Sequence, residues 1–300
     1  MDSRLRARSE KKTGKVHRPS RATRLFIVLR KLKKSRLAVV GFGIVLFAAM
    51  VALLAPIIAP YDVQRMFYGK EAFPPSSEFW LGTDGGGRDV FSWVVWGART
   101  SLYVGLAATL IELLVGLSIG MISGYFGGLI DEILMRITDI VISLPTLLLL
   151  ILALSMFEMR GVHIIILVMG FLGWPLMARV VRGEFLTLKE TTFVEAARSM
   201  GATSWRIILR HILPNTLSTI IVLVTIDIPS YIFWESALTF LGFGDPTTVS
   251  WGALLNTGQP YLRSAWWIAT FPGLAIFFVS LGFNLFGDGL RDALDVKLRE

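Results

Sequence analysis

Six long apolar segments divide this 300-residue chain. They lie near residues 37–59, 102–124, 133–157, 162–182, 216–238 and 265–287. Each is long enough to cross the hydrocarbon core of a bilayer as a helix of about 20 residues. Because 54% of its residues are hydrophobic, the chain is also too apolar for an ordinary soluble domain. The sequence therefore predicts an all-α integral membrane protein with six transmembrane helices.

The distribution of charge predicts how these helices are oriented. Residues 1–36 contain 14 Lys or Arg against two acidic residues, although the net charge of the whole chain is only +8. A basic tail beside a first membrane span is typical of the cytoplasmic side. Apolar residues in the tail recur at helical spacing and predict a short amphipathic helix on the inner leaflet: Leu25, Phe26, Leu29 and Leu32. An even number of spans then places both termini in the cytoplasm, together with the Arg-rich connection 183–215.

That connection carries the signals of a short helix. Thr192, followed by Glu195 three residues later, fits a capping box at a helix start. Ala196 and Ala197 favour helix in the next turn. Gly201 stands where such a helix would end with a positive φ.

The same connection predicts a second short helix directly afterwards. Thr203 or Ser204 can cap this helix, and Pro214 is expected to end it as the fifth span begins. A loop without helices would not need these capping and helix-ending residues. We therefore expect two short helices, joined by a turn, against the inner face of the membrane.

This segment resembles the signature of the membrane permease subunits of ABC importers. The signature has Glu-Ala-Ala, three residues, a Gly, nine residues and an Ile-x-Leu-Pro ending. The matching residues are Glu195, Ala196, Ala197, Gly201, Leu213 and Pro214, and His211 stands where Ile is usual. In that family the element is the coupling helix, which sits in a groove of the ATP-hydrolysing subunit.

The chain is more specifically similar to the dipeptide/oligopeptide permease subfamily, in its shorter-loop "C" type. Three further stretches carry this resemblance: Leu81-Gly82-Thr83-Asp84 with Gly87-Arg88-Asp89, Glu235-Ser236-Ala237-Leu238 with Phe240-Leu241-Gly242, and Gly287-Asp288-Gly289-Leu290-Arg291-Asp292. The resemblance covers roughly residues 25–299. The C-terminal Asp295-Val296-Lys297-Leu298 departs from the usual Asp-Pro-Arg-Leu.

The resemblance implies a type I ABC importer permease fold and a role in peptide import. The expected partners are a second homologous permease, two ATP-binding subunits, an extracellular or periplasmic substrate-binding protein and membrane lipid, but no nucleic acid. ATP and Mg would be used by the ATPase subunits, so the chain itself would bind no cofactor and would not be an enzyme. The expected location is the plasma (inner) membrane of a prokaryote. Related permeases handle oligosaccharides or nickel chelates, and these stay open as alternative cargoes.

These expectations divide the chain into four parts. Residues 1–36 form the basic cytoplasmic tail, and 37–98 the first span with an external segment. Residues 99–288 form the permease core of five transmembrane helices, with the coupling helix at about 190–214. Residues 289–300 form a second cytoplasmic tail.

Three carboxylates in the predicted spans are candidates for the pathway or its gate. Glu112 and Asp227 lie inside spans two and five, where a carboxylate costs roughly 2.5–3.5 kcal/mol on insertion scales. Such groups line a pathway, or they form structural hydrogen bonds between helices, and both interpretations stay open. Glu235 lies near the outer end of span five and is a candidate for closing an external gate.

Small and aromatic residues predict how the helices pack and where the membrane ends. Gly116, Gly120 and Gly124 line one face of the second span, which favours close approach of another helix. Tryptophans gather in the two external segments and are expected mostly at the membrane–water boundary. They are Trp80, Trp93, Trp96, Trp251, Trp266 and Trp267. Prolines inside the spans predict kinks at Pro145, Pro175, Pro229 and Pro272.

Several other classes of function are disfavoured. The chain has no cysteine and its three histidines are far apart in sequence, so no metal-ligand cluster is expected. The glycine-rich stretch 82–88 lacks the Lys-Ser/Thr of a P-loop and predicts an external turn. The G-x-S-x-G pattern around Ser118 lies within a transmembrane helix, where no histidine lies at the same depth to serve as a base.

Two alternatives from other classes remain at this stage. One is an ATP-independent secondary transporter or channel, which would move its substrate without partner subunits. The other is a membrane-anchored nucleic-acid-binding protein that uses the basic residues 1–36.

Overall fold

A computed structural model describes residues 30–157, 161–245 and 247–294. Most of the predicted amphipathic helix in the tail, and the departing stretch 295–298, lie outside these residues. Within them the chain is helical, and its β-structure is limited to one isolated bridge between Thr83 and Asp89. The predicted all-α class is therefore confirmed.

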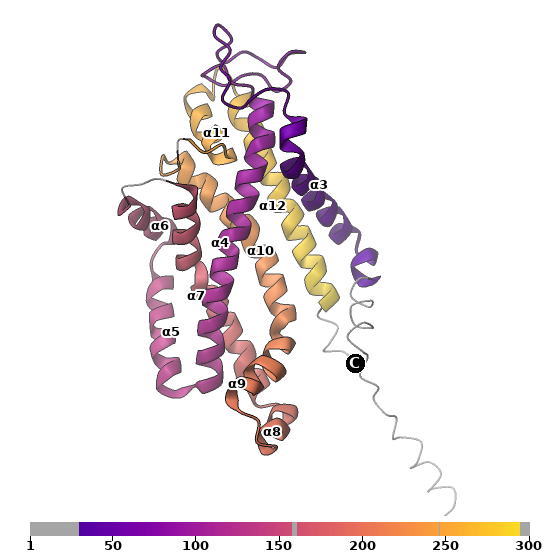
Figure 1. Ribbon diagram of the computed structural model, residues 1–300, viewed down its shortest axis with the longest axis vertical. Helices are drawn as coiled ribbons and strands as arrows, with labels where there is room; N and C mark the ends of the chain where they lie inside the picture. The colour runs from indigo at the N-terminus through magenta and orange to yellow at the C-terminus, as the bar shows by residue number, and fades with distance from the viewer. Residues whose placement is uncertain (1–29, 158–160, 246, 295–300) are drawn as a thin grey trace, which may run out of the picture.

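The helices follow one another along the chain with short connections, apart from one long segment without helix at 59–89 (Figure 1). In order they are α3 (Arg36–Ile58), α4 (Val90–Phe126), α5 (Gly128–Ser143), α6 (Thr146–Ser155), α7 (Val162–Lys189), α8 (Thr192–Ser199), α9 (Ser204–Ile207), the π-helical turn η2 (Ile208–Ile212), α10 (Leu213–Phe240), α11 (Trp251–Gly258), the 3₁₀ turn η3 (Gln259–Tyr261) and α12 (Trp267–Leu294). Five of the described helices are long and apolar enough to cross a membrane: α3, α4, α7, the helix that runs from α9 into α10, and α12.

The third predicted span differs from the expectation of one continuous helix at 133–157. Helices α5 and α6 together are apolar enough to cross, but they meet at an angle of 91°. The break lies at Leu144, whose backbone is extended because Pro145 follows it. The six-span count therefore holds only if this bent pair forms one span.

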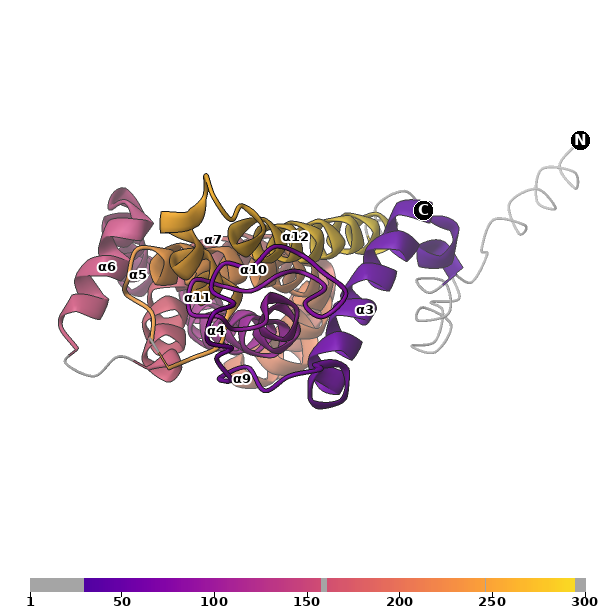
Figure 2. The ribbon, with the colours of Figure 1, turned by 90° about the horizontal axis from the view of Figure 1, so that it is seen from above.

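Viewed from above, the helices form an elongated array (Figure 2). Helices α5 and α6 lie at one edge, α3 lies at the opposite edge, and α4, α7, α10 and α12 lie between them. The centre of this array holds α10, which contacts α4, α7 and α12.

The predicted glycine face on α4 is confirmed as the contact with α7. A Cβ atom added at Gly120 would lie 2.6 Å from the carbonyl oxygen of Ala178. Added Cβ atoms at Gly116 and Gly124 would each lie 2.7 Å from a side-chain carbon of α7. Only glycine allows the two backbones to approach this closely.

A cap, formed by residues 60–89 with α11 and η3, covers one end of the array (Figure 1). We call it the outer cap, and the opposite end the inner end, after the orientation that the charge distribution predicts. Helix α4 begins at Val90, twelve residues before the predicted span, and therefore reaches into this cap. Asp89 caps its first turn by accepting hydrogen bonds from the Ser92 backbone N–H at 2.8 Å and hydroxyl at 2.6 Å. Burial nevertheless raises the pKa of the Asp89 carboxyl above its ordinary value.

The expectation that most tryptophans are interfacial anchors is wrong for three of them. Trp93, Trp251 and Trp267 are buried in the outer cap, and each indole N–H donates to a backbone carbonyl. Trp93 and Trp267 pack in one apolar cluster with Leu254 of α11, whereas Trp251 packs in a second cluster with residues of α4, α10 and α12. Trp80 and Trp266 are exposed, as the expectation requires.

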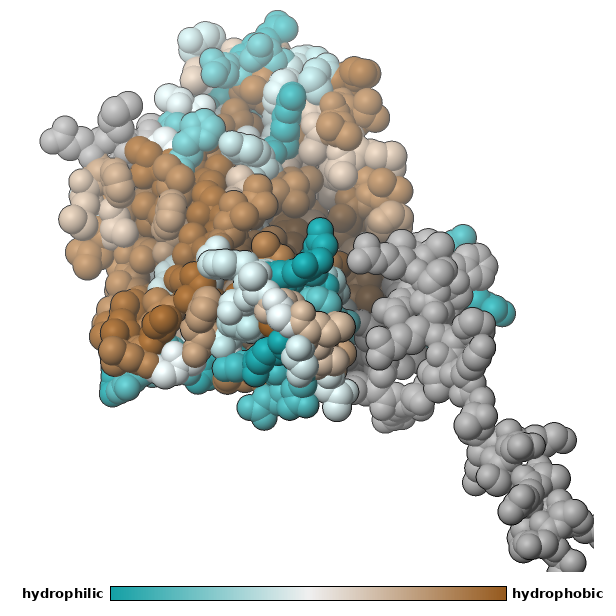
Figure 3. Space-filling view, turned by 60° about the horizontal axis from the view of Figure 1, so that its bottom comes forward, coloured by the Kyte–Doolittle hydropathy of each residue, from teal (hydrophilic) through white to brown (hydrophobic). Residues whose placement is uncertain are grey.

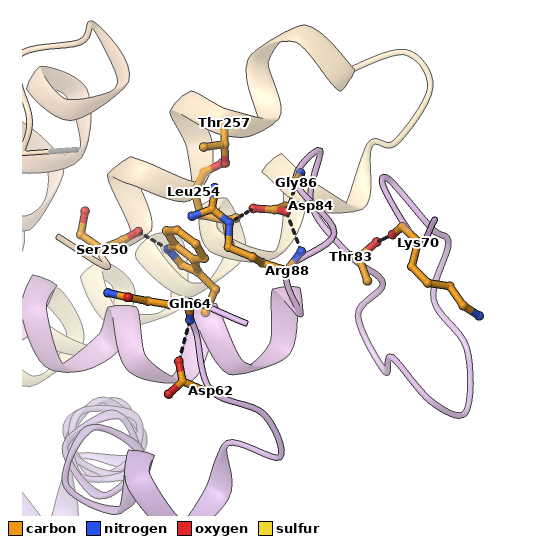
Figure 4. Close-up of polar contacts among 11 residues, drawn as sticks. Asp62, Gln64, Lys70, Thr83, Asp84, Gly86, Arg88, Ser250, Leu254 and Thr257 are labelled. Carbon is orange, nitrogen blue, oxygen red and sulfur yellow. Dashed lines mark hydrogen bonds and ion pairs between the residues drawn. The ribbon is translucent and has the colours of Figure 1, made fainter. Parts of the chain in front are cut away.

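The glycine-rich stretch 82–88 forms an ordered turn within the outer cap. Asp84 Oδ1 accepts the backbone N–H groups of Gly86 and Arg88, both at 2.8 Å (Figure 4). The Arg88 guanidinium lies 3.1 Å from Asp84 Oδ2 and 4.5 Å above the ring of Trp93. A side chain at Gly85 would collide with Tyr261 of η3, so the turn packs directly on the rest of the cap.

Candidate functional site

The end of the molecule opposite the outer cap carries an exposed helical element, α8 to η2, at the bottom of Figure 1. Its anchor is apolar: Val194 and Ala197 of α8, with Ile207, Ile208 and Ile212, are buried. They pack with residues of α4, α7 and α10 in one cluster. The element is therefore fixed to the inner ends of three long helices.

Gly201 ends α8 with φ +78°, which confirms the predicted positive φ. Its backbone N–H bonds to the Arg198 carbonyl at 2.9 Å, and the Ala202 N–H bonds to the Ala197 carbonyl at 3.1 Å. These two bonds are those of a Schellman motif. A residue with a Cβ atom would strain this turn although the space around Gly201 is open.

The predicted capping box between Thr192 and Glu195 is wrong. The N-cap residue of α8 is Thr191, and its hydroxyl donates to the Leu188 carbonyl at 2.6 Å instead of accepting from α8. Because α8 follows α7 after a connection of two residues, the hydroxyl satisfies a carbonyl at the end of α7. Neither Thr203 nor Ser204 makes a side-chain cap at the start of α9.

The expectation that Pro214 ends the second short helix is also wrong. Helix α9 continues through η2 into α10, giving one helical stretch from Ser204 to Phe240. In the π turn the Leu213 N–H bonds to the Ile208 carbonyl, five residues back. The His211 carbonyl accepts from the Asn215 side chain at 2.6 Å. A π turn accommodates Pro214, which supplies no N–H, without ending the helix.

Some of the signature residues are buried in the protein, and others are exposed on its surface. Ala197 is buried, Leu213 and Pro214 are half-buried, and Glu195, Ala196 and Gly201 are exposed. Two large apolar side chains are also exposed at the tip of the element, which is the turn from α8 to α9: Met200 at 80% and Trp205 at 55%. Seen from this end, polar residues gather below a broad apolar belt (Figure 3). The tip therefore offers charged and apolar groups together, as protein-docking surfaces do.

Ion pairs fasten α5 to α7 near this inner end. Arg182 of α7 binds both carboxylate oxygens of Asp131 of α5, at 2.5 and 2.6 Å. The Ser123 hydroxyl of α4 donates to the same Asp131 carboxylate. Arg179 and Asp139 form a second pair between α5 and α7 at 2.7 Å.

Deeper in the array lies a cavity of about 380 Å³, lined by residues of α4, α5, α6, α7 and α10. Glu112 and Asp227 both line it, so the structure brings these two predicted carboxylates together. Tyr231, one turn beyond Asp227 on α10, lies between them and α7, with its hydroxyl against Gly173.

The third predicted carboxylate, Glu235, is placed elsewhere. It is 3% exposed and accepts hydrogen bonds from the hydroxyls of Thr239, at 3.1 Å, and Ser236, at 3.3 Å. Ser250, which caps α11, also lies beside it. Glu235 therefore joins α10 to the outer cap and does not line the cavity.

Several residues of these sites are not marked by any sequence pattern. Tyr231 and the Asp131–Arg182 pair depend on contacts between helices that are distant in sequence. The π turn is not expected either, although Pro214 after a helix-biased run was an available signal. Arg179 also lines the cavity.

The array of long apolar helices defines the class of the protein as integral to the membrane. The family model described as "Binding-protein-dependent transport system inner membrane component" matches residues 116–300. The model "N-terminal TM domain of oligopeptide transport permease C" matches residues 23–75. The chain thus belongs to the family of inner membrane components of binding-protein-dependent transport systems, as the sequence resemblance predicted.

Curated relatives agree with this assignment. The dipeptide transport system permease protein DppC of Bacillus subtilis (strain 168) is 44% identical over 272 residues, covering 90% of this chain and 85% of the relative. The oligopeptide transport system permease protein OppC of the same organism is 41% identical, covering 90% and 88%. The glutathione transport system permease protein GsiD of Pectobacterium atrosepticum is 40% identical, covering 90% of each chain.

A solved structure shares the fold. The chain aligns with inward-facing MetNI methionine ABC transporter with a TM-score of 0.56 and 21% identity. The match covers 67% of this chain and 96% of that one. This likeness confirms the predicted type I ABC importer permease fold.

Proposed function

We propose that this chain is the permease subunit of an ATP-driven importer of dipeptides or oligopeptides. Permeases of dipeptide, oligopeptide and glutathione systems, 40–44% identical over about 90% of the chain, support a peptide cargo. The chain would form half of the translocation pathway, and a second homologous permease would form the other half. Its membrane would be the plasma membrane of a prokaryote, with the outer cap outside and α8 in the cytoplasm.

The observation that carries the coupling role is the continuity of α9, η2 and α10. The second part of the exposed element, α9 with η2, belongs to one helical stretch with the cavity-lining residues Asp227 and Tyr231. Helix α8 lies outside this stretch and packs against it through Val194 and Ala197. A force applied to α8 and α9 would therefore tilt α10 and move the walls of the cavity. The ATP and Mg chemistry would be that of two ATP-binding subunits that grip Glu195, Ala196 and Gly201.

The other two sites would serve the same cycle. The outer cap would receive a substrate-binding protein, and exposed aromatic side chains such as Tyr68 and Trp80 would supply contact area. Glu112 and Asp227 would lie on the pathway. Glu235 would hold the outer gate, because it connects α10 to the cap of α11.

Charge reversal on the exposed element tests this proposal. In proteoliposomes that contain both permeases, the ATPase subunits and the binding protein, Glu195→Arg is expected to abolish ATP-dependent uptake of a dipeptide and co-purification of the ATPase. Membrane insertion should be unchanged, because Glu195 is exposed and has no packing role. Glu132→Arg, the same change at an exposed position of α5, is the control and should retain uptake.

Each other outcome has a clear meaning. If the Glu195→Arg variant takes up dipeptide at the wild-type rate, the coupling role is contradicted. Uptake by the permeases alone, without ATP or partner subunits, would instead favour a secondary transporter or channel. Uptake of an oligosaccharide or a nickel chelate, with no uptake of peptide, would leave the machinery intact and change the cargo.

A further inference from the structure

The cavity lined by α4, α5, α6, α7 and α10 carries polar groups that could bind a particular kind of ligand. Its polar lining consists largely of Glu112, Asp227, Ser230 and Tyr231, with the indole of Trp234 beside them and Arg179 nearer the inner end. Its volume of about 380 Å³ lies in the range of small-molecule sites.

Glu112 is the least satisfied of these groups. Its side chain is 3% exposed, and its Oε2 atom is buried without a hydrogen-bond partner among the described residues. The Tyr231 hydroxyl faces the same carboxyl group, and Asp227 is close enough to interact with it electrostatically. A carboxylate oxygen held away from water and left unpaired is a costly arrangement unless a ligand completes it.

Among the described residues, no positive charge in the cavity is left over to balance these two carboxylates. Among the basic side chains that the structure describes, only Arg179 lines the cavity, and it is paired with Asp139 at 2.7 Å. Glu112 and Asp227 therefore form an acidic pair, on two different helices, that a cation could bridge. Tyr231 and Trp234 add aromatic rings, which attract cations by their π faces.

We infer that this cavity binds a primary ammonium group, held between the carboxylates of Glu112 and Asp227. The ligand class is a small organic molecule with a free amine. If the proposed function is correct, the physiological ligand is the α-ammonium group of a short peptide in transit. The same contacts would give the permease a selectivity of its own, apart from that of the binding protein.

A binding measurement without the binding protein tests this inference directly. The probes are benzylammonium and its uncharged isostere benzyl alcohol, titrated at neutral pH into the permease–ATPase complex in lipid nanodiscs. Saturable binding of benzylammonium is expected to be at least tenfold tighter than binding of benzyl alcohol. Glu112→Gln and Asp227→Asn should each weaken benzylammonium binding about tenfold or more, and should leave benzyl alcohol binding unchanged.

Two further variants separate binding from folding. Glu132→Gln removes an exposed carboxylate of α5 that does not line the cavity, and it should bind like the wild type. Glu112→Asp keeps the charge and should retain part of the preference for the ammonium probe. Each variant is accepted only if its complex elutes as a single species with an unchanged unfolding temperature.

The remaining outcomes overturn the inference. Equal binding of both probes, unchanged binding in Glu112→Gln and Asp227→Asn, or no saturable binding of benzylammonium would show that the carboxyls have only a structural role. ATP-dependent dipeptide uptake is measured in parallel. If the wild type takes up dipeptide normally but shows no preference for benzylammonium, only this inference is contradicted. If the wild type shows no ATP-dependent uptake at all, the proposed function is contradicted.

Discussion

Gly120 determines how closely α4 and α7 can approach. An added Cβ atom would lie 2.6 Å from the Ala178 carbonyl and 2.7 Å from the Val181 side chain, and both neighbours belong to a packed helix that cannot move aside. Gly124, one turn further along α4, faces the backbone of α7 in the same way. This contact between α4 and α7, which we call the glycine seam, is therefore formed by close packing of small residues and not by polar bonds.

Substituting valine in this seam should loosen the array. We expect Gly120→Val to destabilise the protein by about 1–3 kcal/mol, because overpacking forces the helices apart. The measurement is thermal unfolding of the purified permease complex. Gly43→Val on α3, where the space around the glycine is open, is the matched control. Equal unfolding temperatures for the two variants would contradict the close contact.

Asp84 and Arg88 form the charged centre of the outer cap. Asp84 is 1% exposed, so Arg88→Met would leave a buried carboxylate without its ion pair. Removing one partner of a buried pair costs about 3–5 kcal/mol. We therefore expect the cap to open in Arg88→Met.

Limited proteolysis of residues 60–89 from the outside measures this opening. The double variant Asp84→Asn with Arg88→Met removes both charges and should recover much of the protection. Proteolysis of the single variant at the wild-type rate would contradict a structural role for the pair.

At the scale of elements, the stretch from α9 to α10 is the feature that connects the two sites. The π turn η2 keeps this stretch continuous at Pro214, where the sequence predicts the end of a helix. In the proposed coupling, this continuity would carry a displacement at Ser204 to Asp227, because no loop lies between them.

Interrupting the stretch should separate ATPase binding from transport. Two glycines inserted between Ile212 and Leu213 are expected to reduce dipeptide uptake at least tenfold, because the flexible joint no longer transmits the tilt. Co-purification of the ATPase subunits should persist, since α8 and α9 are unchanged. Two glycines inserted after Gly69, in an open external turn, serve as the control. Uptake that survives the first insertion would show that α10 is not the transmitting element.

The sequence predicts the long helices better than it predicts the caps and turns that connect them. Apolar length predicts each of the long helices α3, α4, α7, α10 and α12, although α4, α7 and α12 extend beyond the predicted spans. The positive φ at Gly201 is likewise local, and it was predicted correctly.

The failures share a physical cause, which is competition from other parts of the chain. The Thr192 cap failed because a neighbouring threonine satisfies α7 instead, and the helix stop at Pro214 failed because a π turn accommodates it. Burial of Trp93 and Trp251 follows from the fold of the outer cap, which no periodicity reveals. The carboxylates Glu112 and Asp227 were found by sequence, but their shared cavity was not.

At the scale of the whole molecule, function is divided between two ends. The outer cap and the α8–η2 element lie at opposite ends of the helical array, with the cavity between them (Figure 1). An importer needs this separation, because substrate arrives on one side of the membrane and ATP is hydrolysed on the other. The central claim is that a separate ATPase grips the inner end.

The absence of cysteine in the sequence makes this claim easy to measure, since an introduced cysteine is the only thiol of the chain. Met200→Cys, at the exposed tip beyond α8, should cross-link to the ATPase subunit and resist a membrane-impermeant maleimide applied to intact cells. Tyr68→Cys in the outer cap, 90% exposed, should behave in the opposite way. Labelling of Met200→Cys from outside the cell, or its failure to cross-link to any nucleotide-hydrolysing partner, would contradict the account.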